Sequence, residues 1–238
     1  MKAFLLAGGR GERLRPLTVT CPKCLVPING VPLLEIWLER CRQQGIDEVL
    51  VNVSHHADRV REFLARRSGT PRVELVVETD PRGTAGTVSA NRWFVDGEDS
   101  FWVIYADNLT DCSLAAMLDS HSRHEELLTM ALFHAPEPSA AGIVETLADG
   151  RIVSFEEKPA HPRGDLASAG IDLARVGLIG ELTLAPGRIV DFGFDVLPRL
   201  VGRMYGHVID GYFADIGTPA ALARASAAWA NRVPGTET

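Results

Sequence analysis

A glycine-rich segment near the N-terminus carries the clearest chemical pattern in the sequence. Residues 6–15 read Leu-Ala-Gly-Gly-Arg-Gly-Glu-Arg-Leu-Arg, directly after a short apolar run. Backbone without Cβ atoms can approach a ligand closely, and its N–H groups can point at phosphate oxygens. Arg10, Arg13 and Arg15 stand where they would hold such phosphates. The segment therefore predicts a site for a phosphate-bearing ligand.

Two commoner glycine motifs do not fit this segment. A dinucleotide-binding fingerprint that starts at Gly9 needs glycine at position 14, where Leu14 stands. The P-loop pattern Gly-x-x-x-x-Gly-Lys-Ser/Thr occurs nowhere in the chain, so ordinary ATPase or kinase chemistry is disfavoured.

Hydrophobic periodicity predicts the elements that must position this loop. In the first half, strands at residues 2–7, 48–53, 73–77 and 101–105 alternate with helices at 32–44, 57–67 and 85–94. This alternation predicts an α/β fold whose sheet is parallel and carries helices on both faces. It also places the glycine-rich loop at the carboxyl end of the first strand, where ligands bind in such sheets.

The second half has a different pattern. A helix is expected at 114–124 and a strand at 128–133, and a hairpin at 142–147 and 151–156 turns at Asp149-Gly150. Further strands are expected at 169–174, 204–209 and 213–216, before a final helix at 219–231. The sheet is therefore expected to be mixed and mostly parallel, with an added antiparallel portion.

Composition and charge exclude several classes of protein. Of the 238 residues, 46% are hydrophobic and 23% are charged, which excludes a disordered or fibrous chain. The net charge of −7 argues against a nucleic-acid or membrane-surface binder. No apolar run approaches the ~20 residues of a membrane span, and no signal peptide is evident. We expect a soluble cytoplasmic protein. Cys21 and Cys24 form a C-x-x-C pair without the second pair that a zinc site needs, so reduced thiols are expected.

Residues 6–18, together with Pro22-Lys23 and Val26-Pro27, match a longer pattern, L-A-G-G-x-G-x-R-L-x-P-L-T followed by P-K. In this pattern the chain resembles the sugar-1-phosphate nucleotidyltransferases, also called nucleotide-sugar pyrophosphorylases, and among them the mannose- and heptose-1-phosphate guanylyltransferases. Further segments resemble that family in the same order, at 83–86 (GTAG), 105–108 (YADN), 155–159 (FEEKP), 168–171 (SAGI) and 213–219 (FADIGTP).

This resemblance implies a three-layer αβα, Rossmann-like nucleotidyltransferase fold and the reaction sugar 1-phosphate + NTP → NDP-sugar + pyrophosphate. The attacking phosphate oxygen is already an anion, so positioning and charge neutralisation carry the catalysis and no general base is needed. By the same resemblance, Arg13 grips the triphosphate, Lys23 neutralises the phosphates at the reacting centre, and Lys158 contacts the sugar phosphate. Asp107 and Asp215 are the implied ligands of Mg²⁺.

The resemblance also implies two sets of binding residues. The nucleotide set is Leu6, Ala7, Gly8, Gly9, Gly11, Glu78, Gly83, Thr84 and Ala85. The sugar set is Gly142, Glu157, Lys158, Ser168, Gly170 and Asp191.

The family position that reads the base edge is filled by Glu78. A carboxylate only accepts hydrogen bonds, and guanine offers two adjacent donors, so GTP is favoured. Uridylyl, thymidylyl, cytidylyl and adenylyl transfer stay open as alternatives. A non-catalytic relative that binds nucleotide sugars and a glycosyltransferase are less consistent with the sequence, because Arg13, Lys23, Asp107 and Asp215 are all present.

Several departures from the family pattern lie on the sugar side. Ser168 stands where Asn is usual, Asp172 replaces a common Tyr, and Gly193 stands where Glu is frequent. These departures leave the sugar or cyclitol phosphate open, and they suggest that Ser168, Asp172 and Asp191 shape an unusual pocket.

The matching segments also bear on domain organisation. They extend nearly to the end of the sequence, so residues 1–238 are expected to form a single catalytic domain without a C-terminal β-helix. Family members are often dimers or tetramers, which leaves room for a homo-oligomer. Outside the matching segments, His121 and His124 are expected on a solvated helix face.

Overall fold

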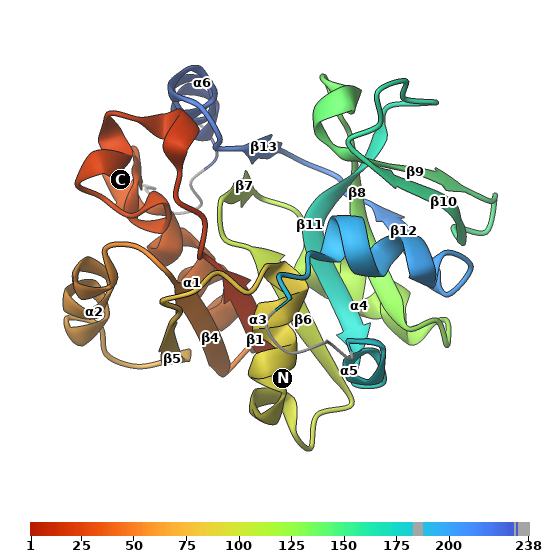
Figure 1. Cartoon of the computed structure of the whole chain (residues 1–238), viewed down its shortest axis with the longest axis horizontal. Coiled ribbons are helices and arrows are strands. Elements are labelled where there is room, and N and C mark those ends of the chain that lie inside the picture. The colour runs from red at the N-terminus through yellow and green to blue at the C-terminus, as the bar shows by residue number, and fades with distance from the viewer. Residues whose placement is uncertain (183–187, 231, 233–238) are drawn as a thin grey trace. The chain divides into compact units, whose positions relative to one another are not determined.

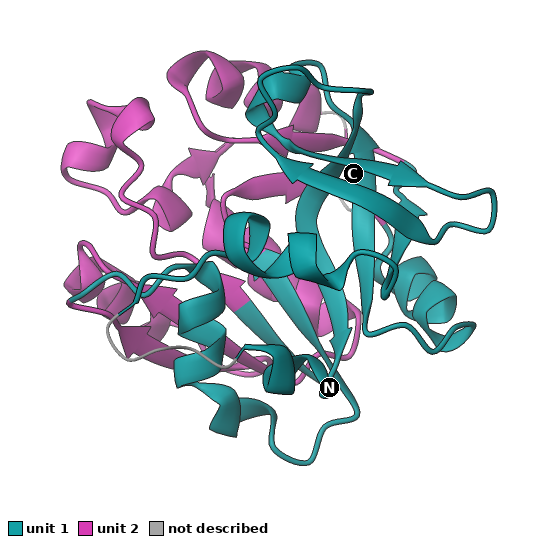
Figure 2. Cartoon of the chain, turned by 45° about the vertical axis from the view of Figure 1, so that its right-hand side comes forward, with its two compact units in different colours: residues 1–4, 80–104, 113–210 teal, residues 5–79, 105–112, 211–238 magenta. Residues whose placement is uncertain are grey.

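The computed structural model describes residues 1–182, 188–230 and 232 (Figure 1). The chain divides into two compact units (Figure 2). Unit 1 comprises residues 1–4, 80–104 and 113–210, and unit 2 comprises residues 5–79, 105–112 and 211–238. The chain passes between the units after residues 4, 79, 104, 112 and 210, so neither unit is one continuous stretch of sequence.

Unit 2 holds the alternating elements of the first third of the chain, except that residues 2–4 of the first strand belong to unit 1. Strands β1 (Lys2–Leu6), β4 (Glu48–Val53) and β5 (Arg72–Val77) are neighbours in that order, and β4 pairs with β5 in parallel. Helix α1 (Leu33–Gln43) connects β1 towards β4, and α2 (Ala57–Ala65) connects β4 to β5. The predicted alternation of parallel strands and helices is confirmed here.

Shorter elements complete unit 2. Strand β2 (Pro27–Ile28) pairs with β3 (Val31–Pro32), and β7 (Asn108–Thr110) pairs with β13 (Phe213–Asp215), both antiparallel. Helix α6 (Pro219–Trp229) follows β13. The start of α6 is fixed by its first residues. The Thr218 hydroxyl caps the helix by accepting a hydrogen bond from the Ala221 N–H at 3.1 Å, and a proline, which favours the start of a helix, occupies the first turn.

Unit 1 contains the antiparallel portion. Its elements are α3 (Thr84–Ala90), β6 (Ser100–Tyr105), α4 (Leu114–Ser122), β8 (Leu128–His134), β9 (Gly142–Thr146), β10 (Ile152–Glu157), β11 (Leu166–Arg175), α5 (Leu178–Glu181) and β12 (Met204–Val208). Strand β11 pairs antiparallel with β6, β8 and β9, and β9 pairs antiparallel with β10. Strand β12 runs parallel to β8. The predicted hairpin is therefore confirmed.

The apolar residues that predicted these elements form their cores. On α1, the side chains of Leu34, Trp37, Leu38 and Cys41 are buried, at the three- and four-residue spacing of one helix face. In unit 1, the ring of Phe4 meets Phe94 edge-on, with ring centres 5.4 Å apart.

Some expectations need correction. The helix expected at 85–94 is α3 followed by a separate 3-10 helix at Arg92–Val95. The end of the last expected helix, at Asn231, lies outside the described residues. The expectation of a solvated face is wrong for His121, which is only 3% exposed because it lies on the buried side of α4, where its ring contacts the Thr129 hydroxyl of β8. None of the helices in the described ranges has the length and apolar character needed to cross a membrane.

Candidate active site

The two predicted metal-ligating aspartates are brought side by side by the short antiparallel pair of strands β7 and β13 in unit 2. Asp107 lies in the turn between β6 and β7, and Asp215 ends β13. Because β13 pairs antiparallel with β7, Asp215 stands opposite Asn108, and the Ile216 N–H donates to the Asp107 carbonyl at 3.0 Å. Two carboxylates more than a hundred residues apart in sequence thus become neighbours.

The predicted catalytic cations contact these carboxylates. The Lys23 ammonium donates to Oδ2 of Asp107 at 2.7 Å and lies 3.7 Å from Oδ1 of Asp215. The Arg13 guanidinium lies 3.8 Å from Oδ2 of Asp215. All four residues predicted to perform the chemistry on the triphosphate therefore meet within unit 2.

Burial differs strongly among these four side chains. The side chain of Lys23 is 9% exposed, whereas that of Arg13 is 69% exposed. A buried ammonium requires paired carboxylates, and Asp107 and Asp215 supply them. Partial burial raises the pKa of Asp215; Lys23 opposes that shift and the neighbouring Asp107 reinforces it. The exposed guanidinium of Arg13 is therefore accessible to an anionic ligand.

Asp107 and Asp215 also have the right chemistry for a divalent cation. Each of the two aspartates has a carboxylate oxygen within 3.7 Å of the same positive charge, the Lys23 ammonium. Within the described residues, no group of three or more His, Cys, Asp or Glu side chains could hold a metal. Mg²⁺ is commonly bound through one or two carboxylates together with substrate phosphates and water, so a pair of carboxylates suits it.

The glycine-rich loop is held by polar side chains of β4 and the residues after it. The Ala7 N–H donates to Oδ1 of Asn52 at 2.9 Å, and the Ser54 hydroxyl donates to the Gly8 carbonyl at 2.6 Å. A Cβ atom at Gly8 would lie 2.8 Å from Nδ2 of Asn52, so only glycine fits there without displacement. The loop is therefore fixed on one side before any ligand binds.

A second glycine of the loop lies against Lys23. Gly11 has a φ of +62°, and a Cβ atom there would lie 2.9 Å from Cγ2 of Thr18 and 3.2 Å from Cβ of Lys23. The Thr18 hydroxyl donates to the Gly11 carbonyl at 2.7 Å. Close approach and a left-handed backbone both require glycine at this position.

Glu78, the predicted base-reading residue, lies directly after β5 and is 5% exposed. Its Oε2 accepts a hydrogen bond from Nδ2 of Asn52 at 3.0 Å. Asn52 therefore joins the glycine-rich loop to Glu78. Sequence reasoning missed Asn52, although an amide inside the apolar strand EVLVNV was a signal that could have identified it. Leu6, also predicted, is buried, and its carbonyl accepts from the Ala106 N–H at 3.1 Å.

In unit 1, the predicted nucleotide residues at the start of α3 contact Asp191. The Thr84 hydroxyl donates to Oδ2 of Asp191 at 2.8 Å, and Oδ1 of Asp191 accepts from the Gly193 N–H at 2.9 Å. A Cβ atom at Gly83 would lie 2.3 Å from the Val190 carbonyl oxygen, which also accepts from the Ala85 N–H at 3.1 Å. Asp191 thus orders this segment, while its sugar contact stays a prediction.

Glu157 occupies a slot between two glycines of unit 1. A Cβ atom added at Gly142 would lie 2.7 Å from Oε2 of Glu157, and one added at Gly193 would lie 2.6 Å from the same oxygen. Burial raises the pKa of Glu157, and the Lys158 ammonium, 3.6 Å from Oε1, opposes that shift. The Lys158 backbone has a φ of +49°, and its ammonium lies over the ring of Phe194. The predicted Gly142, Glu157 and Lys158 are therefore gathered together.

The predicted residues on β11 are ordered by a bulge. Gly170 has a φ of +64°, its N–H donates to the Ser168 hydroxyl at 3.3 Å, and the pairing with β8 shifts register between Ser168 and Asp172. Asp172 itself is 2% exposed, and its Oδ1 has no hydrogen-bond partner within the described structure. Burial raises the pKa of Asp172 to about 7. Asp172 is thus a core residue of β11.

The predicted residues therefore fall into two sets. Unit 2 holds the glycine-rich loop, Glu78, Lys23 and both aspartates, and unit 1 holds the start of α3 and the sugar-side residues. On an α/β scaffold, a pair of carboxylates held beside a lysine and an arginine is typical of proteins that bind phosphate-bearing ligands together with a divalent cation.

A family model for nucleotidyl transferases matches residues 2–232, and the chain belongs to that family. The chain is 34% identical over 230 residues to a mannose-1-phosphate guanylyltransferase of Mycobacterium tuberculosis, covering 94% of this chain and 63% of that protein. It is also 34% identical to the catalytic subunit beta of mannose-1-phosphate guanylyltransferase of Danio rerio, covering 92% of this chain and 62% of that protein. The chain thus spans about three fifths of the length of these relatives.

Solved structures support the fold. A candidate glucose-1-phosphate thymidylyltransferase from Bacillus anthracis, solved in complex with a sucrose, superposes with a TM-score of 0.87. The match covers 99% of this chain and 98% of that one, at 24% identity. The predicted αβα, Rossmann-like nucleotidyltransferase fold with a mixed central sheet is therefore confirmed.

Proposed function

We propose that this protein transfers a guanylyl group from GTP to a sugar 1-phosphate, giving a GDP-sugar and pyrophosphate. The observation that carries the proposal is the convergence of Arg13, Lys23, Asp107 and Asp215 through contacts of 2.7–3.8 Å. Membership of the nucleotidyl transferase family and the likeness to mannose-1-phosphate guanylyltransferases support it. We extend the proposal to one catalytic domain formed by residues 1–238.

The proposed reaction is an in-line displacement at phosphorus. An oxygen of the sugar phosphate forms a bond to the α-phosphorus of GTP, and the bond from that phosphorus to the bridging oxygen breaks. The electron pair leaves with pyrophosphate. Arg13 neutralises the departing pyrophosphate, and Lys23 neutralises the phosphate oxygens around the reacting phosphorus. Since the nucleophile is an anion already, these residues need not accept a proton.

The proposal includes Mg²⁺ held by Asp107 and Asp215. A bound Mg²⁺ would supply further positive charge to the phosphates and would fix their orientation. Lys23 would then be released from Asp107 to contact phosphate. The loop that carries Lys23 is suited to this exchange because its backbone is braced by Gly11 and Thr18.

Selection of guanine is proposed for Glu78. Its carboxylate accepts hydrogen bonds only, and N1–H and the 2-amino group of guanine are adjacent donors. Asn52 holds one Glu78 oxygen through its amide, and backbone groups of the glycine-rich loop lie next to the same amide. Uracil and thymine present one such donor, so their nucleotides are expected to bind less well.

For the sugar 1-phosphate, we propose that Lys158 contacts the phosphate and Glu157 accepts from sugar hydroxyls. Gly142 and Gly170 would line the site with backbone, beside Ser168 and Asp191. We also place the protein in the cytoplasm, because each of the four cysteines is a free thiol, as a reducing compartment requires. Assembly into a homo-oligomer is part of the same proposal, by analogy with the family.

The test is pyrophosphate release with Mg²⁺ across five NTPs and a panel of sugar 1-phosphates that begins with mannose 1-phosphate. We expect GTP to give the highest kcat/KM. Absence of turnover with every pair would refute the enzymatic proposal. A clear preference for another NTP would mean that this NTP, and not GTP, is the nucleotide substrate. Preference for plain mannose 1-phosphate would count against an unusual pocket shaped by Ser168 and Asp191, since Asp172 is buried in the core.

A further inference from the structure

A cavity of about 580 Å³ lies in unit 2 between helix α2 and the segment that precedes Lys23. Its volume falls within the range of about 300–1,000 Å³ typical of small-molecule sites. The residues that matter for its chemistry are Cys21, Leu25, Arg59, Phe63, Arg66 and Arg67. None of them belongs to the residues predicted for the nucleotidyl transfer, so this cavity has no role in the proposed reaction.

The cavity has a positive lining in a chain whose net charge is −7. Three arginines line it and only one carboxylate, Glu62, does so. Arg67 is compensated by Glu35, whose Oε2 lies 2.9 Å from Nε of Arg67. Arg59 and Arg66 form no ion pair with any side chain that the structure describes. Two guanidinium groups are therefore available to an anion.

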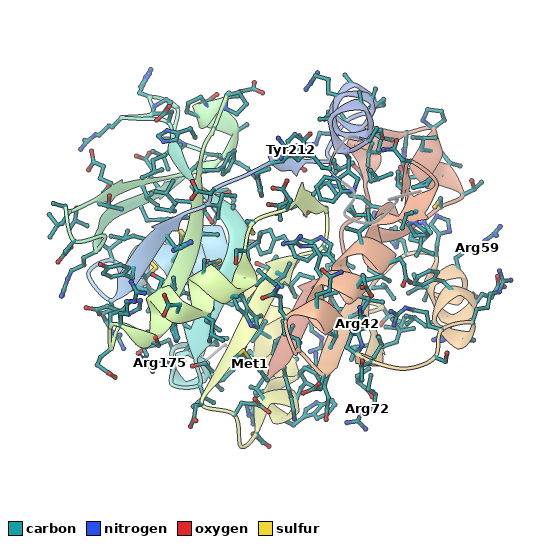
Figure 3. The ribbon with its side chains drawn as sticks, turned by 180° about the vertical axis from the view of Figure 1, so that it is seen from behind. Met1, Arg42, Arg59, Arg72, Arg175 and Tyr212 are labelled. Carbon is teal, nitrogen blue, oxygen red and sulfur yellow. The ribbon has the colours of Figure 1, made fainter. Side chains whose placement is uncertain are left out.

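The spacing of these residues along α2 indicates the shape of the ligand. Arg59 and Phe63 stand at i and i+4 on one face of α2, and Arg66, which caps the C-terminal end of the helix directly after Ala65, stands at i+7. Seven residues of helix rise about 10.5 Å, so the two arginines approach the cavity from opposite ends with an aromatic ring between them. Figure 3 shows Arg59 projecting from α2. Leu25 adds apolar surface from the opposite wall.

We propose that this cavity binds an organic phosphate with at least two negative charges and an uncharged ring between or beside them. Arg59 and Arg66 would hold the phosphate groups through charge-assisted hydrogen bonds. Phe63 and Leu25 would pack against the ring. Hexose bisphosphates and nucleoside diphosphates share this chemistry.

The same wall carries a link to the catalytic lysine. Cys21 and Pro22 line the cavity, and Lys23 begins the 3-10 helix that follows them, Lys23–Leu25. The Leu25 N–H donates to the Pro22 carbonyl at 2.9 Å, so these residues form one short hydrogen-bonded turn. A ligand pressed against Cys21 and Leu25 would therefore shift the Lys23 ammonium relative to Asp107. Binding in the cavity is expected to change the affinity for the nucleotide, and the coupling must act in both directions.

Cys21 provides a local reporter of occupancy. It is partly exposed and lines the cavity, whereas the other three cysteines are buried. We would measure the rate of Cys21 alkylation by iodoacetamide, read by peptide mass spectrometry, during titration with glucose 1,6-bisphosphate, GDP or inorganic phosphate. With a bisphosphate or diphosphate at ten times its dissociation constant, alkylation of Cys21 is expected to slow about tenfold. Inorganic phosphate is expected to protect only weakly.

The matched variants are Arg59→Gln/Arg66→Gln and the control Arg61→Gln/Arg72→Gln. Arg61 and Arg72 are exposed and do not line the cavity. Their substitution by glutamine removes the same amount of positive charge as the first variant does. Protection should disappear in the first variant and persist in the control. If protection of Cys21 persists in both variants, the protecting ligand binds at the nucleotide site, and the proposal is overturned. The proposal is also overturned if neither glucose 1,6-bisphosphate nor GDP protects Cys21 in the wild type. Because no turnover is measured, failure of the proposed transferase reaction would not affect this result.

The coupling to Lys23 has its own measurement. In wild-type protein, a saturating organic phosphate that protects Cys21 should change the KM for GTP at least about threefold. The Arg59→Gln/Arg66→Gln variant should keep the KM of the unliganded wild type and should not respond. An unchanged KM in the wild type, with Cys21 fully protected, would overturn the coupling.

Discussion

At the scale of single residues, the structure gives Asp107 a contact that sequence alone could not measure. Its Oδ2 accepts the shortest contact of the buried Lys23 ammonium, at 2.7 Å. We expect Asp107→Ala to lower kcat/KM at least about 100-fold, because the variant loses a proposed ligand of Mg²⁺, whose charge would stabilise the transition state. Lys23 keeps Asp215 as a partner at 3.7 Å, so the variant should remain folded. Pyrophosphate release and thermal unfolding are the measurements.

The control for this variant is Asp58→Ala. Asp58 is exposed on α2, where it pairs with Arg61. Exposed pairs on one helix contribute only about 0.3–0.5 kcal/mol, so this variant should retain its activity and its Tm. Near-normal activity of Asp107→Ala would remove Asp107 from the set of metal ligands.

Gly193 is a second residue whose role depends on an ångström-scale distance. A Cβ atom there would lie 2.6 Å from Oε2 of Glu157, so Gly193→Ala must displace that carboxylate. If Glu157 holds the sugar, the KM for the sugar 1-phosphate should rise about tenfold, which corresponds to about 1.4 kcal/mol. The KM for GTP should not change. Steady-state kinetics with each substrate varied in turn will separate the two.

Gly164→Ala is the matched control, because a Cβ atom at Gly164 meets nothing within 4 Å. It should leave both KM values unchanged. If Gly193→Ala raised the two KM values equally, Glu157 would be a structural residue and not a sugar contact.

At the scale of elements, β4 is connected to the glycine-rich loop by a single amide. Asn52 accepts from the Ala7 N–H at 2.9 Å and donates to Glu78 at 3.0 Å. Asn52→Ala leaves the Ala7 N–H and a Glu78 oxygen without these partners, which costs about 1–3 kcal/mol of stability. We also expect a higher KM for GTP, because the loop proposed to bind its phosphates loses its attachment to β4.

Asn52→Asp separates the two contacts of this amide. The aspartate keeps an acceptor for Ala7 but places a second carboxylate against Glu78. It should therefore bind GTP less well than Asn52→Ala. Equal KM values for wild type and Asn52→Ala, measured by pyrophosphate release, would show that the loop needs no support from β4.

How far these elements could be predicted depends on the range of the interactions that form them. Strand β4 was predicted with its observed bounds, 48–53, because its apolar run is local information. The pairing of β7 with β13 was not predicted, since it joins Asn108 to Asp215 across the chain. The sequence pattern indicated the aspartates only through resemblance. The contacts of Asn52 likewise come from tertiary structure, and periodicity carries no record of them.

Helix α4 is tied to β8 through a buried histidine. Nδ1 of His121 lies 2.7 Å from Oγ1 of Thr129, and its other ring nitrogen lies 3.3 Å from the Ser100 hydroxyl. Burial, followed by the charge of Arg175, lowers the pKa of His121 to about 4. Between about pH 6.5 and about pH 4 the unfolded chain therefore binds a proton that the folded protein does not.

Unfolding free energy should consequently fall as the pH is lowered through this window, by roughly 3 kcal/mol from this histidine. Asp172 acts in the opposite direction, because its folded pKa of about 7 favours the protonated folded state. Comparison with His121→Gln removes the contribution of Asp172, which both proteins share. Urea unfolding at pH 7.5 and pH 4.5 should show a smaller loss in the variant. Parallel losses in the two proteins would contradict the burial of a neutral His121.

At the scale of the whole molecule, charge is distributed unevenly. The chain carries −7 overall, yet Lys23 and Arg13 stand together at the paired aspartates and three arginines line the cavity beside α2. An acidic chain that handles polyanions must concentrate its cations at such places. The two proposed anion sites differ in this respect: the first combines Lys23 and Arg13 with the partly exposed carboxylates of Asp107 and Asp215, whereas the second has three arginines and one carboxylate, Glu62.

The distribution of cysteines allows a test of cooperativity over the whole chain. All four cysteines belong to unit 2, and Cys24, Cys41 and Cys112 are buried. Burial raises the pKa of Cys24 and of Cys41 to about 12, so neither forms a reactive thiolate while folded. In native protein only Cys21 should react promptly with a thiol reagent, and all four should react in denaturant.

Unit 1 contains no cysteine, but strands β1 and β6 each contribute residues to both units. Opening either unit alone would therefore break a strand in its middle. We expect the three buried thiols to become reactive over the same urea range in which far-UV circular dichroism reports loss of the whole fold, as a two-state transition requires. Exposure of these thiols at a lower urea concentration than the loss of circular dichroism would mean that unit 2 unfolds independently, and it would contradict a single catalytic domain.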